Sequence, residues 1–260
     1  MELGLKGKVA LVTGSSRGIG RGAALALAAE GCDLMLTGRD QKALEDVAGK
    51  IRTMGPRAAI SVLDLREPGA AEKLIEQVKR ELGGLDILVN NAGATKRGDF
   101  LALTDADFAD GYALKFFGHV RLARAAWPLL KERRGSLIAI GGTGGRKPTA
   151  EFTIGASVNA AVAAFSKCLA DRGKEDGVQV NCIHPSMVET DRLWRRIEAE
   201  MKRTGWAEDK ARAEMCKGFG ITRFGKVDDV ADLITFLVSS RATWMHGATI
   251  DLDGGEIPTL

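Results

Sequence analysis

Thr13-Gly14-Ser15-Ser16-Arg17-Gly18-Ile19-Gly20 is the stretch that decides the fold of this chain. It follows the apolar run Val9–Val12, which is typical of a buried strand, and it precedes Arg21–Glu30, whose alanines and leucines predict a helix. A glycine turn between a strand and a helix presents backbone N–H groups and the positive end of the helix dipole, so it favours a bound phosphate. The spacing is Gly-x3-Gly-x-Gly, which differs from the general dinucleotide fingerprint G-x-G-x-x-G. The stretch predicts a phosphate-binding turn, with incidental glycines in a strand-turn-helix as the alternative.

Outside this stretch, strand and helix patterns alternate along the chain. Helical spacing of apolar residues predicts a helix after Asp40, one around 74–82, a long one from about 105 to 133 and one over 156–171. Pro128 is expected to kink or end the regular part of the long helix. Six further apolar segments predict strands, at residues 33–37, 58–63, 85–89, 136–140, 178–183 and 248–252. This alternation predicts an α/β fold with a doubly wound, seven-stranded parallel sheet and helices on both faces.

Several glycine-rich or polar segments follow directly after predicted strands. Besides the glycine turn, these are Asn90–Gly93, Gly141–Gly145 and His184–Thr190. Parallel sheets bind their ligands beyond the carboxyl ends of the strands. We therefore expect these segments to meet at one edge of the sheet and to form one site.

Bulk composition narrows the class of protein further. The chain has 260 residues, 45% of them hydrophobic and 27% charged, which suits one large α/β domain over residues 1–260. A net charge of only +3 argues against a general nucleic-acid partner. No apolar run reaches about 18 residues, and the first strand follows Met1–Lys6 at once, so neither a membrane span nor a signal peptide is expected. The four scattered cysteines predict reduced thiols in a cytoplasmic protein, and no metal-ligand spacing predicts a metal.

The residues at the strand ends resemble those of the short-chain dehydrogenase/reductase family. The likeness rests on Thr13-Gly-x3-Gly-Ile-Gly20, Asp64, Asn90-Asn-Ala-Gly93, Pro185-x2-Val-x-Thr190 and Asp253-Gly-Gly255, and it runs from end to end of the chain. The resemblance implies a single-domain Rossmann fold that binds NAD or NADP and moves a hydride to or from a carbonyl or alcohol substrate. It also implies a homo-oligomer, a tetramer or a dimer.

Which nicotinamide cofactor binds is decided just after the second predicted strand. An acidic residue there would hold the 2′-hydroxyl of NAD and repel the 2′-phosphate of NADP. This chain has Thr37-Gly38-Arg39 instead, and Asp40 is expected to point away as a helix cap. Arg39 and Arg17 supply two cations for a phosphate, so NADP(H) is predicted in preference to NAD(H). The alternative is that Arg39 is a solvated surface charge.

The family's catalytic pattern is absent from this chain. The resemblance implies a tyrosine four residues before a lysine, a serine thirteen residues before that tyrosine, and an asparagine on the long helix. The flanking residues place Gly155 at the tyrosine position and Asn159 at the lysine position. They place Gly142 at the serine position and Lys115 at the asparagine position. The chain's one tyrosine, Tyr112, lies on the long helix and is expected to pack there. The usual phenol acid is therefore missing.

An exchange of lysine and asparagine keeps an ammonium near the predicted site. If Lys115 and Asn159 project into one pocket, Lys115 could donate a proton to a carbonyl or stabilise an oxyanion, and burial beside other cations would lower its pKa. The alternative is that Lys115 only holds cofactor hydroxyls and a water. Thr143 adjoins the vacant serine position and could supply a hydroxyl. The predicted catalytic residues are thus Lys115, Asn159 and Thr143, whereas His119, His184 and Lys147 have structural explanations.

The predicted contacts with the cofactor come mainly from the glycine turn and the strand ends. Their members are Gly14, Ser15, Ser16, Arg17, Gly18, Ile19, Gly20, Arg39, Asp64, Leu65, Asn90, Asn91, Ala92, Gly93, Lys115, Pro185, Ser186, Val188 and Thr190.

The segment 191–221 is predicted to be a lid over the substrate. Leu193, Ile197 and Met201 recur at helical spacing among charged residues, which predicts an amphipathic helix. Because the resemblance implies that this segment covers the substrate, its apolar face suggests a hydrophobic or ring-bearing small molecule. An interface or an ordinary pair of surface helices is the alternative.

Three functions are compatible with the sequence. The first is an NADP(H)-dependent oxidoreductase with an atypical active site. The second is a catalytically inactive NADP(H)-binding protein that acts as a sensor or partner subunit. The third is a lyase or isomerase that depends on Lys115. The exchange of lysine and asparagine favours the first over simple decay of the site, because random loss would not restore an ammonium.

Overall fold

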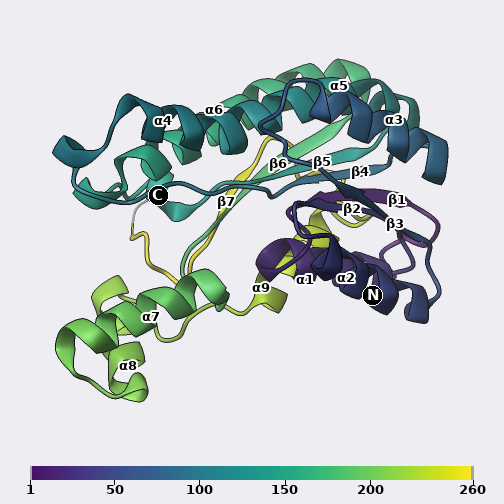
Figure 1. Cartoon of the computed structure of the whole chain (residues 1–260). Coiled ribbons are helices and arrows are strands. Elements are labelled where there is room, and N and C mark those ends of the chain that lie inside the picture. Colours follow the sequence, from purple (N-terminus) through teal and green to yellow (C-terminus); the bar gives the residue numbers. More distant parts are fainter. Residues whose placement is uncertain (1, 259–260) are drawn as a thin grey trace.

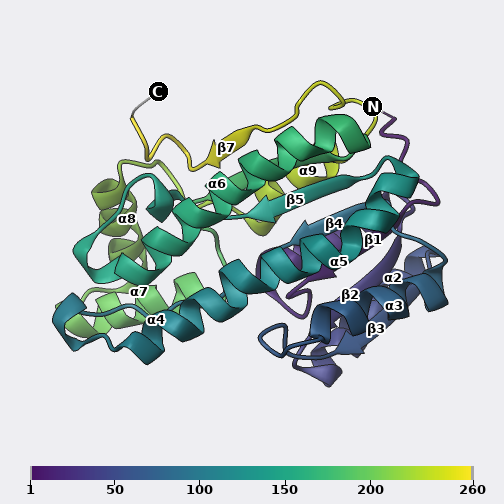
Figure 2. The same ribbon diagram turned by 90° about the horizontal axis from the view of Figure 1, so that it is seen from above.

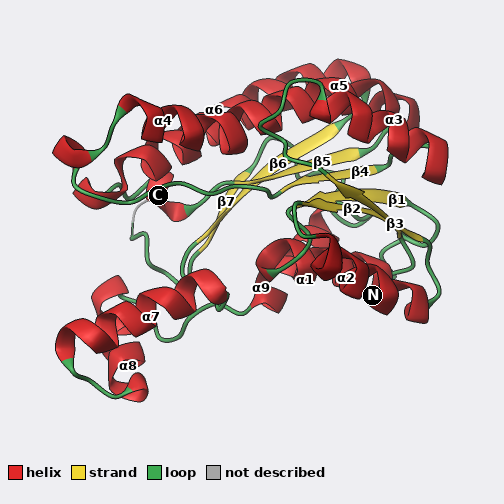
Figure 3. Cartoon of the chain, in the orientation of Figure 1, coloured by secondary structure: helices red, strands yellow, loops and turns green. Residues whose placement is uncertain are grey.

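A single parallel sheet of seven strands forms the centre of the computed structural model, which describes residues 2–258 (Figures 1 and 3). The strands lie in the order β3-β2-β1-β4-β5-β6-β7, so the direction of winding reverses between β1 and β4. In doubly wound sheets this reversal opens the crevice where ligands bind. The strand bounds are β1 Val9–Thr13, β2 Asp33–Gly38, β3 Ala58–Val62, β4 Ile87–Asn90, β5 Ser136–Ile140, β6 Gln179–Pro185 and β7 Thr249–Leu252.

Helices cover both faces of this sheet. Helices α1, α2 and α9 pack on one face, and α3, α5 and α6 pack on the other, with α4 continuing the line of α5 (Figures 1 and 2). The inner strands are buried on both faces, which explains why they are continuous apolar runs. The helix bounds are α1 Gly18–Ala29, α2 Gln41–Met54, α3 Ala70–Leu82, α4 Asp105–Tyr112, α5 Gly118–Arg133, α6 Thr153–Asp176, α7 Asp191–Thr204, α8 Glu208–Phe219 and α9 Val227–Leu237.

The predicted α/β fold is confirmed, with differences at the ends of elements. Strand β4 begins at Ile87 rather than Leu85, and α6 is longer than the predicted 156–171. Pro128 does not end the long helix, which continues to Arg133. The carbonyl that Pro128 leaves without an N–H partner belongs to Arg124, an exposed residue, so water can satisfy it.

The long helix contains one irregular turn. Residues Ala113–Phe117 form a π-helical turn between α4 and α5. Such turns are rare and occur frequently at functional sites. This one carries Lys115, and it therefore sets where the lysine leaves the helix.

Helices α7 and α8 form a hairpin outside the three layers (Figure 1). The hairpin has a small core of its own, made of Leu193, Ile197, Ala211, Ile221 and Phe224. The two main apolar residues of the predicted amphipathic helix are thus buried inside the hairpin. Helix α7 consequently has less apolar surface to offer a ligand than the sequence suggested.

Helix α6, with the short turn before it, is long and apolar enough by length and composition to cross a membrane. Its residues Ile154, Val158, Val162 and Ala170 are buried in the core on one face of the sheet. Packing against the sheet accounts for this apolar composition.

Candidate functional site

A cavity of about 800 Å³ lies beyond the carboxyl ends of the strands. The segments predicted to meet at this edge all contribute to its wall, through Gly14, Asn91, Gly141 and Pro185 among others. Helix α7 of the hairpin adds Arg192 and its neighbours. The cavity has the size and the position of a site for a small molecule in a sheet of this kind.

The glycine turn is held in a shape that only glycine allows. Gly14 and Gly18 have φ values of +64° and +55°, which side chains disfavour. A Cβ on Gly20 would overlap the carbonyl oxygen of Gly14 and lie 2.5 Å from the Asn91 amide nitrogen. The Thr13 hydroxyl oxygen accepts hydrogen bonds from the backbone N–H groups of Asn91 and Ala92, at 2.8 and 2.9 Å. The turn is therefore braced against the end of β4.

The first turn of α1 fits a phosphate. Among the residues that the structure describes, no side chain caps the N-terminus of this helix, and its first turn has no acidic residue. Its free N–H groups and the dipole therefore face the cavity, where Arg17, Gly18 and Ile19 line the wall. This arrangement suits the diphosphate of a dinucleotide.

The end of β2 carries the cations expected to meet an adenosine phosphate. Arg17 and Arg39 both line the cavity there, and the strand ends on Thr37 and Gly38 without an acid. Arg39 lies 3.6 Å from a carboxylate oxygen of Asp64, which also pairs with Arg66 at 3.0 Å. The Arg39 side chain is 67% exposed and so keeps access to a ligand. A 2′-phosphate would thus meet a positive field.

Most of the predicted cofactor contacts line this cavity, but three do not. Ser15 is buried, and its hydroxyl oxygen accepts a hydrogen bond from the N–H of Thr37 at 2.9 Å. Asn90 is buried and donates to the carbonyl of His119 at 3.3 Å, while Gly20 packs under the turn. Those that do line the wall are Gly14, Ser16, Arg17, Gly18, Ile19, Arg39, Asp64, Leu65, Asn91, Ala92, Gly93, Lys115, Pro185, Ser186, Val188 and Thr190.

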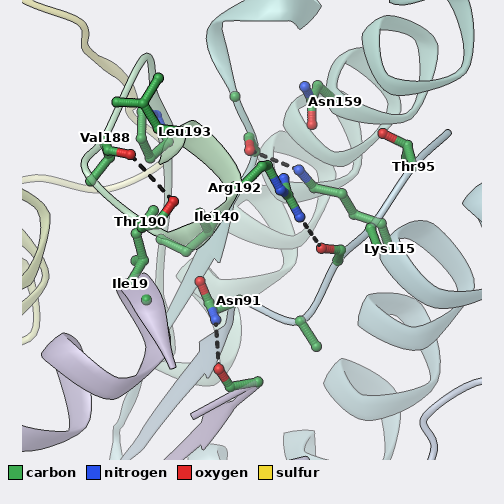
Figure 4. A pocket seen from close by; sticks show the side chains of 18 of the residues that line it. Ile19, Asn91, Thr95, Lys115, Ile140, Asn159, Val188, Thr190, Arg192 and Leu193 are labelled. Carbon is green, nitrogen blue, oxygen red and sulfur yellow. Dashed lines mark hydrogen bonds between the residues drawn. The ribbon is translucent and has the colours of Figure 1, made fainter. Parts of the chain in front are cut away.

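Lys115 reaches into the cavity from the π-helical turn (Figure 4). Its ammonium donates a hydrogen bond to the carbonyl oxygen of Gly141 at the end of β5, at 2.8 Å. Its methylene chain passes over Gly93, where a Cβ would lie 2.8 Å from Lys115 Cδ. Burial, and after it the positive charge of Arg192, lowers the pKa of the lysine from 10.5 to about 7. Lys115 can therefore gain or lose a proton near neutral pH.

Arg192 approaches the same point from the hairpin. Its guanidinium donates a hydrogen bond to the carbonyl oxygen of Gly93 at 2.9 Å, so it and Lys115 both lie against Gly93 (Figure 4). Burial lowers the pKa of Arg192, as do the charges of Arg195 and Arg17. Two cations thus stand close together where the strand ends meet.

Asn159 lies on α6 and also lines the cavity (Figure 4). The residue is 3% exposed, and its side-chain oxygen has no hydrogen-bond partner among the described residues 2–258. A buried acceptor of this kind normally has a partner. A Cβ on Gly142 would lie 2.8 Å from the Asn159 amide nitrogen, so the glycine makes room for the amide. The unpaired oxygen fits a ligand hydroxyl or a water.

The space next to Gly155 is already filled. A Cβ on Gly155 would overlap the ring of Phe152, one helical turn earlier, and a Cβ on Gly144 would lie 2.7 Å from the same ring. Phe152 lines the cavity, with the Arg97 guanidinium 4.0 Å from its ring centroid. An aromatic ring therefore occupies the region beside the position predicted for the family's tyrosine.

Thr143 is buried at the cavity wall and shares a carboxylate with a neighbouring serine. Its hydroxyl donates to Glu256 at 3.4 Å, and the Ser186 hydroxyl donates to the same oxygen of Glu256. Lys147 lies 3.7 Å from the other oxygen. Glu256 is 8% exposed, so this group forms a buried polar cluster at one end of the cavity.

The histidines and the tyrosine are held by packing outside the cavity wall. His119 donates from Nε2 to the carbonyl of Ala92 at 3.3 Å, and burial together with Lys115 lowers its pKa to about 3, so it is neutral. Burial also lowers the pKa of His184, which lies 3.5 Å from Asp251. Tyr112 packs edge-on against Phe116, with ring centroids 6.1 Å apart. These contacts agree with structural roles for all three.

Several cavity residues were missed by the sequence analysis. Arg192 and Arg196 are four residues apart, which places both on one side of α7. Phe152 stands three residues before Gly155, a spacing at which two residues of a helix are neighbours. Arg97 and Glu256 carry no such signal. In residues 2–258, no group of three or more histidine, cysteine, aspartate or glutamate side chains is placed to hold a metal. The missed residues are Arg97, Phe152, Arg192, Arg196 and Glu256.

Comparison with known proteins shows similarity along the whole chain. A family model described as enoyl-(acyl carrier protein) reductase matches residues 14–256. The 3-oxoacyl-[acyl-carrier-protein] reductase FabG of Escherichia coli (strain K12) is 31% identical over 257 residues, which cover 97% of this chain and 98% of that protein. The 2,3-dihydro-2,3-dihydroxybenzoate dehydrogenase of Bacillus subtilis (strain 168) is 28% identical over 261 residues, 97% of each chain.

A solved structure shares the whole fold. The crystal structure of L-sorbose reductase from Gluconobacter frateurii, complexed with NADPH and L-sorbose, matches with a TM-score of 0.96 and 31% identity over 100% of both chains. The similarity therefore extends over the sheet, both helical layers and the hairpin.

Proposed function

Because the chain belongs to the short-chain dehydrogenase/reductase family, we propose that it is an NADP(H)-dependent oxidoreductase that interconverts a carbonyl compound and an alcohol. We further propose that Lys115 replaces the family's tyrosine as the proton donor. The observation that carries this proposal is the Lys115 ammonium, which lies in the cavity, bonded to Gly141 and with its pKa lowered to about 7.

The chain offers a complete set of residues for NADP(H). The uncapped N-terminus of α1 would hold the diphosphate, and Arg17 and Arg39 would hold the 2′-phosphate. Asn159 would accept a hydrogen bond from a ribose hydroxyl through its unpaired oxygen. When bound, NADPH supplies the hydride that reduces the carbonyl carbon, and NADP⁺ accepts it in the reverse direction.

In this mechanism Lys115 supplies the proton. Its ammonium donates a proton to the carbonyl oxygen while negative charge develops there. The resulting neutral amine is then protonated again by solvent. The hydrogen bond to Gly141 fixes the position of Nζ. The positive charge of Arg192 stabilises the developing oxyanion and makes the ammonium more acidic.

The remaining predicted catalytic residues position groups rather than exchange protons. The Thr143 hydroxyl donates to Glu256, so it helps to orient that carboxylate at the cavity wall. Helix α7 closes one side of the cavity, which supports a lid role for residues 191–221. By analogy with its family, the protein would act in the cytoplasm as a homo-oligomer.

A spectrophotometric panel tests this function. The purified protein is mixed with NADPH and with ketones, aldehydes and quinones, and with NADP⁺ and alcohols, while absorbance of the reduced cofactor is followed. Turnover of any carbonyl or alcohol supports the proposal. Tight NADPH binding without turnover of any compound would instead indicate the inactive, cofactor-binding protein, and product formation without a change in cofactor absorbance would indicate the lyase or isomerase.

NADPH is expected to bind more tightly than NADH, and Arg39→Gln to remove most of that preference. The substitution takes away a planar cation that faces the 2′-phosphate, so the dissociation constant of NADPH should rise about tenfold while that of NADH stays nearly constant. Fluorescence titration of both cofactors on both proteins measures this. Equal affinities of the unsubstituted protein for the two cofactors would contradict the predicted preference.

The rate of carbonyl reduction is expected to fall as pH rises through about 7. Only the protonated lysine can donate a proton, and burial has lowered its pKa to about 7, so kcat/KM should drop about tenfold per pH unit on the alkaline side. The measurement is kcat/KM for the carbonyl compound at saturating NADPH from pH 6 to 9. A flat profile over this range would exclude Lys115 as the proton donor.

A further inference from the structure

Positive charge gathers at the end of the cavity away from the adenosine cations. Arg97 comes from the loop after β4, and Arg192 and Arg196 come from successive turns of α7; all three line the cavity. Burial lowers the pKa of Arg97, as do the charges of Arg196 and Arg192, whereas Glu151 raises it. These two arginines of α7 thus repel Arg97 across a shared space.

No carboxylate in residues 2–258 lies within 4.0 Å of any of these three guanidinium groups. Glu151 and Glu256 are near enough to raise the pKa of Arg196 but do not pair with it. Elsewhere in the cavity wall some cations are paired, since Arg66 and Arg39 share Asp64 and Lys147 lies beside Glu256. Partly desolvated cations without a paired carboxylate are costly, so this end is suited to an external anion.

Arg97 is held by an aromatic ring, and Arg196 by a ring and by one N–H···S hydrogen bond, so both keep further N–H groups that pair with no carboxylate among residues 2–258. Arg97 stacks on the ring of Phe152, with its guanidinium carbon 4.0 Å from the centroid. Arg196 contacts the sulfur of Met187 at 2.7 Å and lies 5.4 Å from the Phe219 ring centroid. A guanidinium that stacks on a ring keeps its N–H groups free to bind a carboxylate or phosphate with two parallel hydrogen bonds.

The dinucleotide does not account for Arg97 and Arg196. Its phosphates are expected at Arg17, Arg39 and the N-terminus of α1, whereas Arg97 packs on Phe152 near α6 and Arg196 packs on Phe219 in the hairpin. Arg192 lies between the two regions. The charge of Arg17 lowers the pKa of Arg192, and the charge of Arg192 lowers the pKa of Arg97. Arg97 and Arg196 are therefore available to bind an anion other than the dinucleotide.

We propose that the substrate is a carbonyl compound or alcohol that carries an anionic carboxylate or phosphate group, and that Arg97 and Arg196 bind this group. Phe152 and Phe219, which the two arginines contact, would flank an apolar or ring-bearing body between the anion and Lys115. This inference rests on the proposed function for the reaction, but the binding of the anion does not require turnover.

Binding is measured by isothermal titration calorimetry on the full chain, with and without NADP⁺. The probes are cyclohexanecarboxylate, phenyl phosphate and the neutral cyclohexanecarboxamide. We expect at least one anion to bind, with an affinity at least about tenfold above that of the amide, because charge-assisted hydrogen bonds are worth this much or more. Arg97→Gln and Arg196→Gln should each weaken the anion about 10- to 100-fold and leave the amide unchanged. The comparison of the two anions tells a carboxylate site from a phosphate site.

Arg80→Gln is the matched control, because Arg80 is an exposed arginine on α3 outside the cavity and pairs with Glu81. This variant should bind both anions as the unsubstituted protein does.

A kinetic experiment compares 4-oxocyclohexanecarboxylate with cyclohexanone as substrates. We expect a lower KM for the acid, and we expect Arg97→Gln and Arg196→Gln to abolish this difference. Absence of anion binding, equal binding of the amide, or unchanged affinity in both variants would overturn the inference. Anion binding without any turnover would leave it standing and contradict the proposed function instead.

Discussion

Lys115→Met is expected to lower kcat for carbonyl reduction by about 10²- to 10⁴-fold, the range that a positioned general acid contributes. Methionine keeps an unbranched apolar stem against Gly93, where the lysine stem now passes, but it has no proton to donate and no charge. NADPH should still bind, because the glycine turn and Arg39 are untouched. The measurements are single-turnover reduction and NADPH titration on the same preparation.

The controls separate the proton from the charge and from the fold. Lys167→Met removes a lysine that also donates to a backbone carbonyl, that of Gly247 at 2.7 Å, but lies outside this cavity, so it should keep normal kcat. Lys115→Arg keeps a positive charge that cannot deprotonate at any ordinary pH. It should be nearly as slow as Lys115→Met if Lys115 donates a proton. Full activity of the arginine variant would mean that only the charge matters, and full activity of the methionine variant would remove Lys115 from the mechanism.

The fold was predictable because its inner strands are buried on both faces. The runs Val9–Thr13 and Ser136–Ile140 are continuous apolar segments for this reason, and their alternation with helices leaves few topologies. The errors fell where local pattern and tertiary packing differ. Leu85 is apolar and buried but lies before β4, since the backbone hydrogen bonds to β1 and β5 begin at Asp86, with Val9 and Ser136.

The site was predictable from residue order where residues follow strands directly, and Lys115 and Asn159, on helical segments, were found through the resemblance to a known family. Gly14, Asn91 and Pro185 reach the cavity because every parallel strand ends at the same edge. Arg97 and Arg196 come from a loop and from a helix of the hairpin, and only the way that hairpin folds back brings them together. The apolar residues of α7 were expected to suit the substrate, but Ile197 is used in the hairpin core, and Leu193, which also packs there, lines the cavity beside the arginines of α7.

Gly155→Tyr, which restores a tyrosine at the position where the family is expected to have one, should destabilise the protein rather than repair it. Gly155 is buried, and even a Cβ there would overlap the Phe152 ring. Overpacking of this kind costs about 1–3 kcal/mol, so the midpoint of thermal unfolding should fall by about 2–12 °C. Differential scanning calorimetry measures it. Gly49→Tyr is the matched control, because Gly49 is also helical and a Cβ there meets nothing within 4 Å, so its midpoint should hardly move.

The double variant Phe152→Ala/Gly155→Tyr tests whether the two positions share one volume. Removing the Phe152 ring gives the new tyrosine room, so the double variant should unfold at a higher temperature than Gly155→Tyr alone, with a coupling of about 1–3 kcal/mol between the two positions. A midpoint for Gly155→Tyr equal to that of the unsubstituted protein would show that Phe152 moves aside freely. If the coupling is found, the effect on stability of substituting Gly155 depends on which residue stands at position 152. A tyrosine at position 155 then lowers stability as long as Phe152 is present. The absent tyrosine would then be part of a repacked site, in which Arg97 stacks on the ring that replaced it.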